Sequence, residues 1–183
     1  MPGINSGISQ NVTGVRNTHL APVTSLVQRL FAGKEYVLER RVWVRHPVKD
    51  VFPFFAAAEN LERITPPELG FRIRSQLPIE MRRGALIDYT IKLYGVPMKW
   101  RTGITAWNPP YSFEDTQLRG PYAKWVHTHS FIEESGGTVI EDRVVYALPF
   151  GPLGRIAHPI VARQLKRIFS YREEALSARF QLL

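Results

Sequence analysis

Residues 123–148, AKWVHTHSFIEESGGTVIEDRVVYAL, contain two alternating segments that flank a polar turn. Apolar and polar side chains alternate on both sides of Glu134-Ser135-Gly136-Gly137, a pattern typical of a half-buried antiparallel hairpin. With these four residues as the loop, the predicted cross-strand pairs are Trp125 with Tyr146, His127 with Val144, His129 with Asp142, and Phe131 with Ile140. One face of the hairpin therefore carries its large side chains together with two histidines and an aspartate.

A second predicted hairpin precedes this one, with strands near 85–94 and 98–107 and a four-residue loop at 94–97. Its predicted pairs are Leu93 with Met98, Ile91 with Trp100, Tyr89 with Thr102, and Ile87 with Ile104. Both hairpins place their large side chains on the same face. The opposite face carries charged residues such as Arg101 and Arg143, as a solvated convex surface should.

The remaining segments predict an α+β order of strand, helix, six strands and helix. The predicted strands are 36–45, 71–77, 85–94, 98–107, 111–119, 123–132 and 138–148. Links of about four residues between successive strands indicate antiparallel pairing. One helix begins near Pro47 and extends to Leu61, and a longer one covers about 153–180. Pro159 should kink or start the longer helix, because proline has no N–H to donate.

Several polar side chains fall on the face that carries the large apolar ones, namely Tyr89, Asp115, Gln117, His127, His129 and Asp142. A dry core would leave them unpaired at about 1–3 kcal/mol each, whereas water or a ligand satisfies them in a cavity. We therefore predict a cavity lined by Tyr89, Ile91, Trp100, Ile104, Phe113, Asp115, Trp125, His127, His129, Phe131, Val144 and Tyr146. The sequence leaves the pairing register of the strand over 111–119 undetermined by one residue.

Arg172 falls in the apolar stripe of the last helix although it is charged. The stripe consists of Val161, Leu165, Ile168, Phe169 and Leu176. We predict that the stem of Arg172 packs while its guanidinium reaches the rim of the cavity. The alternative is that the planar guanidinium anchors an acidic ligand group or a carboxylate of the sheet. In both interpretations Arg172 is a candidate ligand-binding residue.

A longer motif extends from the hairpin at 123–148 into the last helix. It comprises Trp125-x-His127-x-His129-x-Phe131, Gly137-Thr138, Asp142-x-Val144-x-Tyr146-x-Leu148-Pro149-Phe150-Gly151-x-Leu153-Gly154, and Phe169-x-Tyr171-Arg172. With the element order over 36–180, it resembles the SRPBCC (START/Bet v 1-like) ligand-binding superfamily, in a bacterial branch near the polyketide cyclase/dehydrase group. The resemblance implies a helix-grip fold, in which a curved antiparallel sheet of about seven strands wraps a long C-terminal helix. It also implies an internal cavity for lipids, sterols, polyketides or other apolar molecules.

His127 and His129 are two residues apart on a predicted strand, so both point to one face. Asp142 could be a third metal ligand, but no ligand-rich spacing such as HExxH is present, and we predict no metal and no cofactor. The favoured interpretation is an imidazole–carboxylate pair, with His129 within hydrogen-bond reach of Asp142. A histidine held by an aspartate in a cavity can also shuttle protons, which makes His127, His129 and Asp142 candidate catalytic residues.

The predicted function is the binding of a small hydrophobic or amphipathic ligand, lipid-like or polyketide-like, by a carrier or sensor. Two alternatives stay open. One is a cyclase/dehydratase-type enzyme that uses the cavity histidines and aspartate as acid–base groups. The other is a protein-interaction module that uses the N-terminal arm or the last helix. The architecture does not decide among them, because one fold hosts both carriers and enzymes.

Composition narrows the class of protein further. The 183 residues suit one domain, and the absence of cysteine excludes disulfides, thiolate metal sites and cysteine nucleophiles. No apolar run reaches the length of a membrane span, so we expect no integral membrane contact. The formal charge is +8, but the cations are scattered while Trp100 and Trp125 face the cavity. We therefore expect no nucleic-acid partner and at most weak contact with an anionic membrane surface.

Residues 1–34 are predicted to form an N-terminal arm, and 35–183 the helix-grip domain. The arm has no acidic residue and no secretory-signal pattern, and we expect a cytoplasmic protein. Leu20, Val23, Leu26, Val27, Leu30 and Phe31 recur at helical spacing. This spacing predicts a short amphipathic helix that docks on the domain or on a partner.

Overall fold

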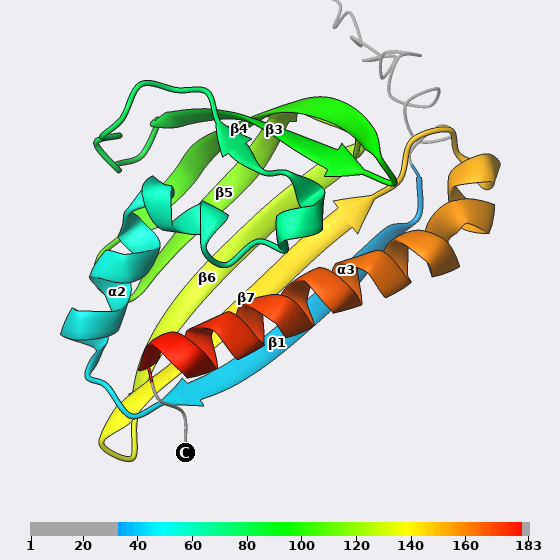
Figure 1. Cartoon of the computed structure of the whole chain (residues 1–183). Helices are drawn as coiled ribbons and strands as arrows, with labels where there is room; N and C mark the ends of the chain where they lie inside the picture. The colour runs from blue at the N-terminus through cyan, green and yellow to red at the C-terminus, as the bar shows by residue number, and fades with distance from the viewer. Residues whose placement is uncertain (1–32, 181–183) are drawn as a thin grey trace, which may run out of the picture. The chain divides into compact units, whose positions relative to one another are not determined.

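The computed structural model describes residues 33–180, so the predicted helix within the arm lies outside the described residues. Seven antiparallel strands form one sheet in the order β1-β7-β6-β5-β4-β3-β2 (Figure 1). The strands are β1 (Glu35–Val44), β2 (Arg72–Ile73), β3 (Leu86–Leu93), β4 (Val96–Asn108), β5 (Ser112–Arg119), β6 (Lys124–Glu134) and β7 (Gly137–Ala147). The helices are α2 (Val48–Ala56), the short 3-10 helices η1 (Ala58–Glu62) and η2 (Pro67–Leu69), and α3 (Pro152–Phe180). The predicted α+β helix-grip fold is confirmed.

The β6–β7 hairpin has the predicted register. His129 pairs with Asp142, and Trp125 pairs with Tyr146. The turn, however, is shorter than the predicted four residues, because the ladder continues to Glu134 and Gly137. Only Ser135 and Gly136 form the turn, with φ of 52° and 75°. Two successive positive φ angles match the right-handed twist of the strands, so a two-residue turn closes the hairpin.

The β3–β4 hairpin is shifted from the predicted register. Its turn is also two residues, Tyr94 and Gly95, with φ of 53° and 80°. Tyr89 therefore pairs with Trp100 instead of Thr102. A shift of two residues leaves every side chain on its predicted face, because side chains alternate with a period of two. The rings of Trp100 and Trp125 lie 5.5 Å apart between centroids, on one face as predicted.

The strand predicted over 71–77 is wrong in length, since only β2 joins the sheet. The chain leaves the ladder after Ile73 because Arg74 N and Ser75 N both donate to the carbonyl of Asp88, at 2.7 and 3.2 Å. The hydroxyl of Ser75 accepts a hydrogen bond from Asp88 N at 2.8 Å. These bonds replace the regular ladder and let the chain bend away.

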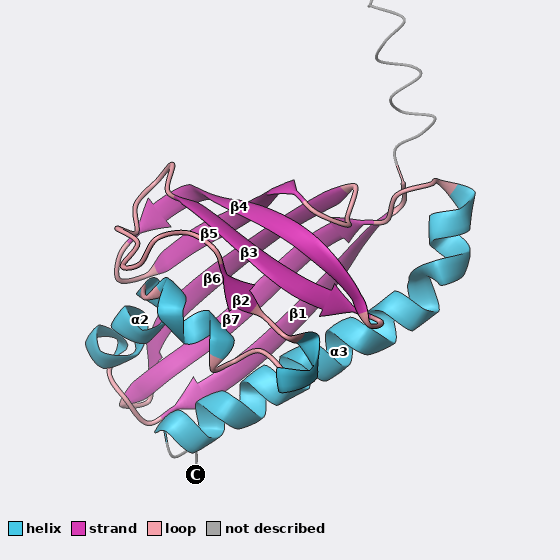
Figure 2. Ribbon diagram, turned by 45° about the horizontal axis from the view of Figure 1, so that its top comes forward, coloured by secondary structure: helices cyan, strands magenta, loops and turns pink. Residues whose placement is uncertain are grey.

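The two main helices cover different parts of the concave face of the sheet (Figure 1). α3 packs along β1, while α2 packs against β6 and β7. α3 continues through Pro159, so a helix start at that residue is wrong. Its first turns bend away from the rest of the helix, as a kink at the proline predicts (Figure 2). None of the helices within residues 33–180 combines the length and apolar character that a membrane span needs.

We expect Phe131→Ala to lower the free energy of unfolding by about 3–5 kcal/mol, because the side chain is 2% exposed and its loss leaves a cavity. Its ring packs against Phe52 and Phe55, with centroids 5.3 and 5.0 Å away. Urea unfolding measures the loss. The matched control is Ile132→Ala on the opposite face, with an expected loss of roughly 1 kcal/mol at most. Equal losses in the two variants would contradict the assignment of faces.

Candidate functional site

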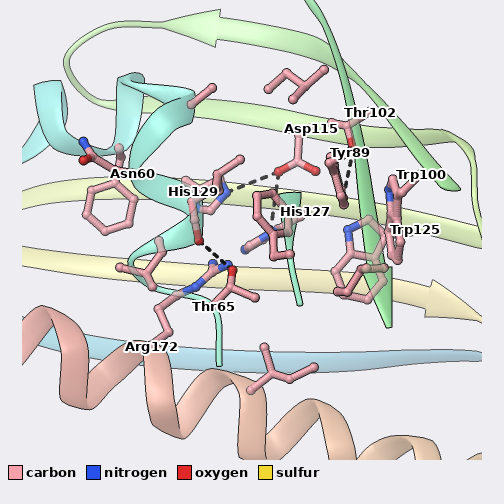
Figure 3. Close-up of a pocket in the computed structure, with 18 of the residues that line it drawn as sticks. Asn60, Thr65, Tyr89, Trp100, Thr102, Asp115, Trp125, His127, His129 and Arg172 are labelled. Atoms are coloured by element: carbon pink, nitrogen blue, oxygen red, sulfur yellow. Dashed lines mark hydrogen bonds and ion pairs between the residues drawn. The ribbon is translucent and has the colours of Figure 1, made fainter. Parts of the chain in front are cut away.

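A cavity of about 130 Å³ lies between the sheet and the covering helices (Figure 3). Strands β3 to β6 form its floor with Ile87, Tyr89, Ile91, Leu93, Trp100, Thr102, Ile104, Phe113, Asp115, Trp125, His127 and His129. The segment from α2 to β3 adds Phe54, Phe55, Ala57, Ala58, Asn60, Leu61, Ile64, Thr65, Leu69, Phe71 and Met81. α3 closes it with Leu165, Ile168, Phe169 and Arg172. The lining is mostly apolar, with a few convergent polar groups, as in ligand-binding sites.

Most of the predicted site residues lie around this cavity. They are Tyr89, Ile91, Trp100, Ile104, Phe113, Asp115, Trp125, His127, His129 and Arg172. The strand register left open at 111–119 places Asp115 opposite His127, on the cavity side. Two independent hairpins thus contribute to one site.

Phe131, Val144 and Tyr146 do not line the cavity, and this part of the prediction is wrong. They point to the concave face as expected, but helices cover them there. Phe131 packs under α2, whereas Val144 and Tyr146 pack under α3 against Leu165. The hydroxyl of Tyr146 reaches His158 Nε2, 3.1 Å away. The helices therefore turn these strand positions into solid core.

The segment between α2 and β3 supplies lining residues that sequence reasoning missed, among them Asn60 and Thr65. Asn60 Nδ2 donates to the carbonyl of Phe54 at 2.9 Å, and Thr65 Oγ1 donates to the carbonyl of Leu61 at 2.6 Å. These bonds fold the irregular segment back over the sheet. The segment has no hydrophobic period that could have indicated its direction, so its sequence carried no such signal.

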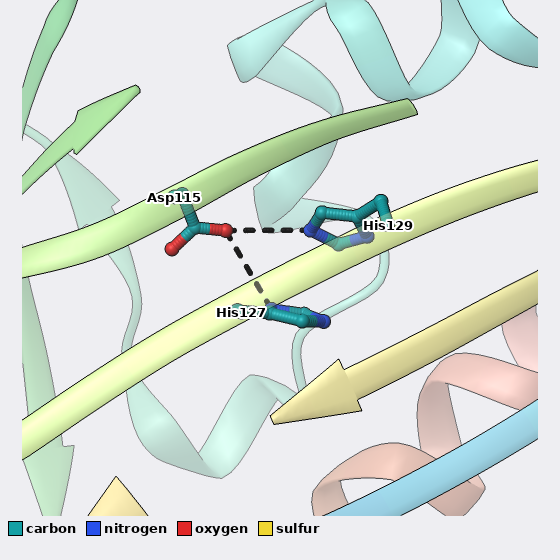
Figure 4. Close-up of side chains that lie close together, drawn as sticks. All are labelled: Asp115, His127 and His129. Carbon is teal, nitrogen blue, oxygen red and sulfur yellow. Dashed lines mark hydrogen bonds and ion pairs between the residues drawn. The ribbon is translucent and has the colours of Figure 1, made fainter. Parts of the chain in front are cut away.

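A cluster of two histidines and two aspartates forms the polar end of the site, and Figure 4 shows three of its members, Asp115, His127 and His129. His127 Nε2 hydrogen-bonds Asp142 Oδ1 at 2.9 Å, and its Nδ1 lies 3.6 Å from Asp115 Oδ2. His129 Nε2 hydrogen-bonds Asp115 Oδ2 at 3.3 Å. Each imidazole therefore lies between two carboxylates, one facing the cavity and one behind it.

The predicted contact between His129 and Asp142 is present, with Nδ1 2.7 Å from Oδ1. The nitrogen is not aligned for a hydrogen bond, so the contact is electrostatic. The hydrogen bond to Asp142 comes instead from His127. Sequence pairing could not reveal this, because Asp142 reaches diagonally across the ladder.

The prediction that Arg172 reaches the rim is wrong. Arg172 is 9% exposed, and its Nη1 lies 3.8 Å from Asp142 Oδ1. Its guanidinium also lies over the ring of Phe169, 4.9 Å from the centroid. The guanidinium points inward because the buried carboxylate of Asp142 attracts it. This agrees with the alternative interpretation, in which Arg172 binds a carboxylate of the sheet.

The cluster divides charge unevenly between the two imidazoles. Burial lowers the pKa of His127, and the neighbouring His129 lowers it further. Burial also opposes protonation of His129, but the carboxylates of Asp142 and Asp115 outweigh it and raise the pKa of His129. Burial would raise the pKa of Asp142, yet the imidazoles of His129 and His127 hold it well below its usual range. These shifts favour the neutral form of His127, the charged form of His129 and the ionised form of Asp142.

Aromatic rings form the opposite end of the cavity. The rings of Tyr89 and Trp100 stack with their centroids 5.6 Å apart. The ring centroids of Tyr122 and Trp125 are 4.8 Å apart. Trp100 Nε1 is buried and has no hydrogen-bond partner within residues 33–180. The Nε and Nη1 atoms of Arg172 also lack one within that range. Unpaired buried donors are costly, so an acceptor bound in the cavity would relieve them.

Comparisons with known proteins support the fold. No family model matches the chain, and no curated protein matches it. The solved Zhui aromatase/cyclase from Streptomyces sp. R1128 is similar, with a TM-score of 0.66 and 14% identity over 81% of this chain and 94% of that chain. A START superfamily protein from Mycobacterium smegmatis has a TM-score of 0.61 and 13% identity over 79% of this chain and 97% of that chain.

The major latex-like protein 151 from Panax ginseng has a TM-score of 0.56 and 11% identity over 81% of this chain and 99% of that chain. At these identities the likeness concerns the fold. The chain therefore has the SRPBCC (START/Bet v 1-like) fold that its motif and element order predicted.

We expect Asp142→Asn to lower the free energy of unfolding by about 3–5 kcal/mol, because it leaves the buried cation of Arg172 uncompensated. Adding Arg172→Met to this variant should recover part of the loss, which urea unfolding of both single variants and the double variant measures. Asp88→Asn, which breaks the exposed pair with Arg101 at 2.8 Å, should cost much less. Additive losses for Asp142 and Arg172 would show that the two side chains are not coupled.

Proposed function

We propose that the protein binds a small hydrophobic or amphipathic molecule in its cavity and acts as a carrier or sensor. The division of the cavity into an aromatic end and a polar end carries this proposal (Figure 3). Trp100 and Trp125 offer apolar surface for a ring. His129 and Arg172 offer hydrogen-bond donors for an acceptor on the same molecule. Such a site binds apolar matter by burial and orients it with a few polar contacts.

The size of the cavity limits the buried part of the ligand to about one ring. A cavity of roughly 150 Å³ in another protein holds benzene, and this one has about 130 Å³. A groove of about 360 Å³ adjoins it and shares Leu93, Tyr122 and Ile168 with its lining. Lipid-like and polyketide-like ligands fit this arrangement if the ring occupies the cavity and the remainder lies in the groove.

The groove provides an entrance between the β3–β4 turn and the start of α3. The Tyr94 hydroxyl in the turn donates a hydrogen bond to the carbonyl of Ile160 in α3 at 3.1 Å, and this bond links the two elements. Phe150 and Leu153 are 81% and 69% exposed beside the groove. Exposed apolar side chains next to Arg155 also suit brief contact with an anionic membrane from which a lipid-like ligand would come.

A cyclase/dehydratase-type enzyme is the second candidate function, favoured by the charge-divided histidine pair. His129, whose pKa is raised, is the better proton donor, and His127, whose pKa is lowered, is the better acceptor, within the same cavity. Product analysis after incubation with a poly-β-keto thioester separates the two functions. A carrier returns the compound unchanged, whereas an enzyme releases a cyclised or dehydrated product that His127→Gln abolishes.

Native mass spectrometry of protein purified from its own host should show a bound small molecule. A larger side chain that fills the cavity should prevent this binding. We expect Ile104→Phe to weaken the binding of toluene at least about tenfold by calorimetry, because the larger side chain occupies the cavity. The matched control is Thr105→Phe on the convex face, which should bind toluene as the unchanged protein does. Equal affinities in all three proteins would place the ligand elsewhere.

Replacement of Arg172 tests whether the polar end takes an acidic group. With benzoate as the probe, Arg172→Met should lose about tenfold or more in affinity and Arg172→Lys less, because a charge-assisted hydrogen bond contributes about 1.5–3 kcal/mol. Toluene, which has no charge, should bind all three proteins alike. Unchanged benzoate affinity in Arg172→Met would eliminate the anchor.

A further inference from the structure

Three potential metal ligands converge on one point at the polar end of the cavity (Figure 4). Asp115 comes from β5 and pairs directly with His127 of β6, while His129 follows two residues later on the same face. One ligand atom from each side chain lies within 4.8 Å of the other two. The strand ladder sets these positions, so the convergence does not depend on a loop.

The two distances from Asp115 to the histidines match the edges of a tetrahedral site. Nitrogen and oxygen ligands that lie 2.0–2.2 Å from zinc are about 3.3–3.6 Å apart in tetrahedral geometry. Asp115 Oδ2 lies 3.3 Å from His129 Nε2 and 3.6 Å from His127 Nδ1. A cation can therefore lie among the three atoms with small side-chain adjustments.

Asp142 supplies the support that metal-bound histidines ordinarily have. Its Oδ1 accepts from His127 Nε2 at 2.9 Å, which leaves the Nδ1 lone pair directed at Asp115 when the imidazole is neutral. The same oxygen lies 2.7 Å from His129 Nδ1, on the far side of that ring. Asp142 thus lies behind both imidazoles, with a hydrogen bond to His127 and an electrostatic contact to His129, while their other nitrogens face the cavity. Arg172 balances the charge of Asp142.

The converging atoms call for positive charge between them. A carboxylate oxygen and an imidazole lone pair repel each other unless a proton or a cation lies between them. A proton on one imidazole satisfies one of the two contacts with Asp115, whereas a metal ion satisfies all three ligands at once. Imidazole and carboxylate ligands suit divalent first-row transition ions.

We propose that His127 Nδ1, His129 Nε2 and Asp115 Oδ2 bind a divalent transition-metal ion, with zinc as the representative. Three protein ligands leave one tetrahedral position, which opens into the apolar cavity and is free for water or for an oxygen of the bound molecule. This revises the sequence-based expectation of no metal, in which Asp142 was the third ligand considered. Asp115 takes that place, and Asp142 orients the two histidines.

Calorimetric titration of the full, tag-free chain with ZnCl₂ after EDTA treatment and dialysis tests the proposal. We expect one zinc ion per chain, and titration with CoCl₂ should give the visible absorption of tetrahedral cobalt. His127→Gln, His129→Gln and Asp115→Asn should each lose both signals. His158→Gln is the matched control, because this histidine contacts Tyr146 outside the cluster and should keep both.

Circular dichroism checks that each variant folds, and zinc should raise the melting temperature of the unchanged protein but not of the ligand variants. We expect Asp142→Asn to weaken zinc binding by about 10–100-fold, as loss of a carboxylate behind ligand histidines does. Absence of stoichiometric binding to the unchanged protein would overturn the proposal. Binding that survives in Asp115→Asn and His129→Gln would overturn it too. Loss of toluene binding is a separate result, because that tests the cavity rather than the metal site.

Discussion

The ion pairs of the buried Asp142 carboxylate hold the site together. It is 5% exposed and lies against the imidazoles of His127 and His129 and the guanidinium of Arg172. These groups come from β7, β6 and α3, so one charge joins the sheet to the helix. A buried charge is tolerated when it is paired. The position of α3 over the sheet and the direction of the histidines are therefore linked.

The positions of the helices over the sheet divide its concave face into core and cavity. Where α2 and α3 lie directly on the strands, large side chains such as Phe131 and Val144 fill the space between the layers. Around the cavity, over β3 to β6, the cover also includes the irregular segment from η1 to β2, and there the layers leave a gap. Close packing elsewhere makes the gap a defined cavity instead of a general looseness.

The proposed ligand, with one apolar ring and one polar group, suits two features of the cavity. Its aromatic end contains the unpaired donor of Trp100, and its polar end holds the charged cluster around His129. The adjoining groove extends the apolar surface toward the start of α3. A carrier and an enzyme can both use this arrangement, because orientation of a bound molecule serves binding and proton transfer alike.

The element order, the antiparallel hairpins and the face of the sheet on which each strand residue lies were predictable from the sequence. Alternation is a local property with a period of two, and it survived even the register shift that pairs Tyr89 with Trp100. The motif around His127 and His129 also led correctly to the SRPBCC fold. Ten of the thirteen predicted ligand-binding residues lie around the cavity because they share that face.

Which positions on this face line the cavity and which belong to the core depends on long-range packing. That depends on where α2, α3 and the segment between η1 and β2 lie over the strands, and no local period encodes such long-range packing. Tyr146 became core for this reason, and Arg172 turned inward because Asp142 is buried beneath it. In the proposed metal site, Asp115 and not Asp142 is the third ligand for the same reason. Strand pairing predicts direct neighbours, whereas a cluster of side chains also forms along diagonals and toward a helix.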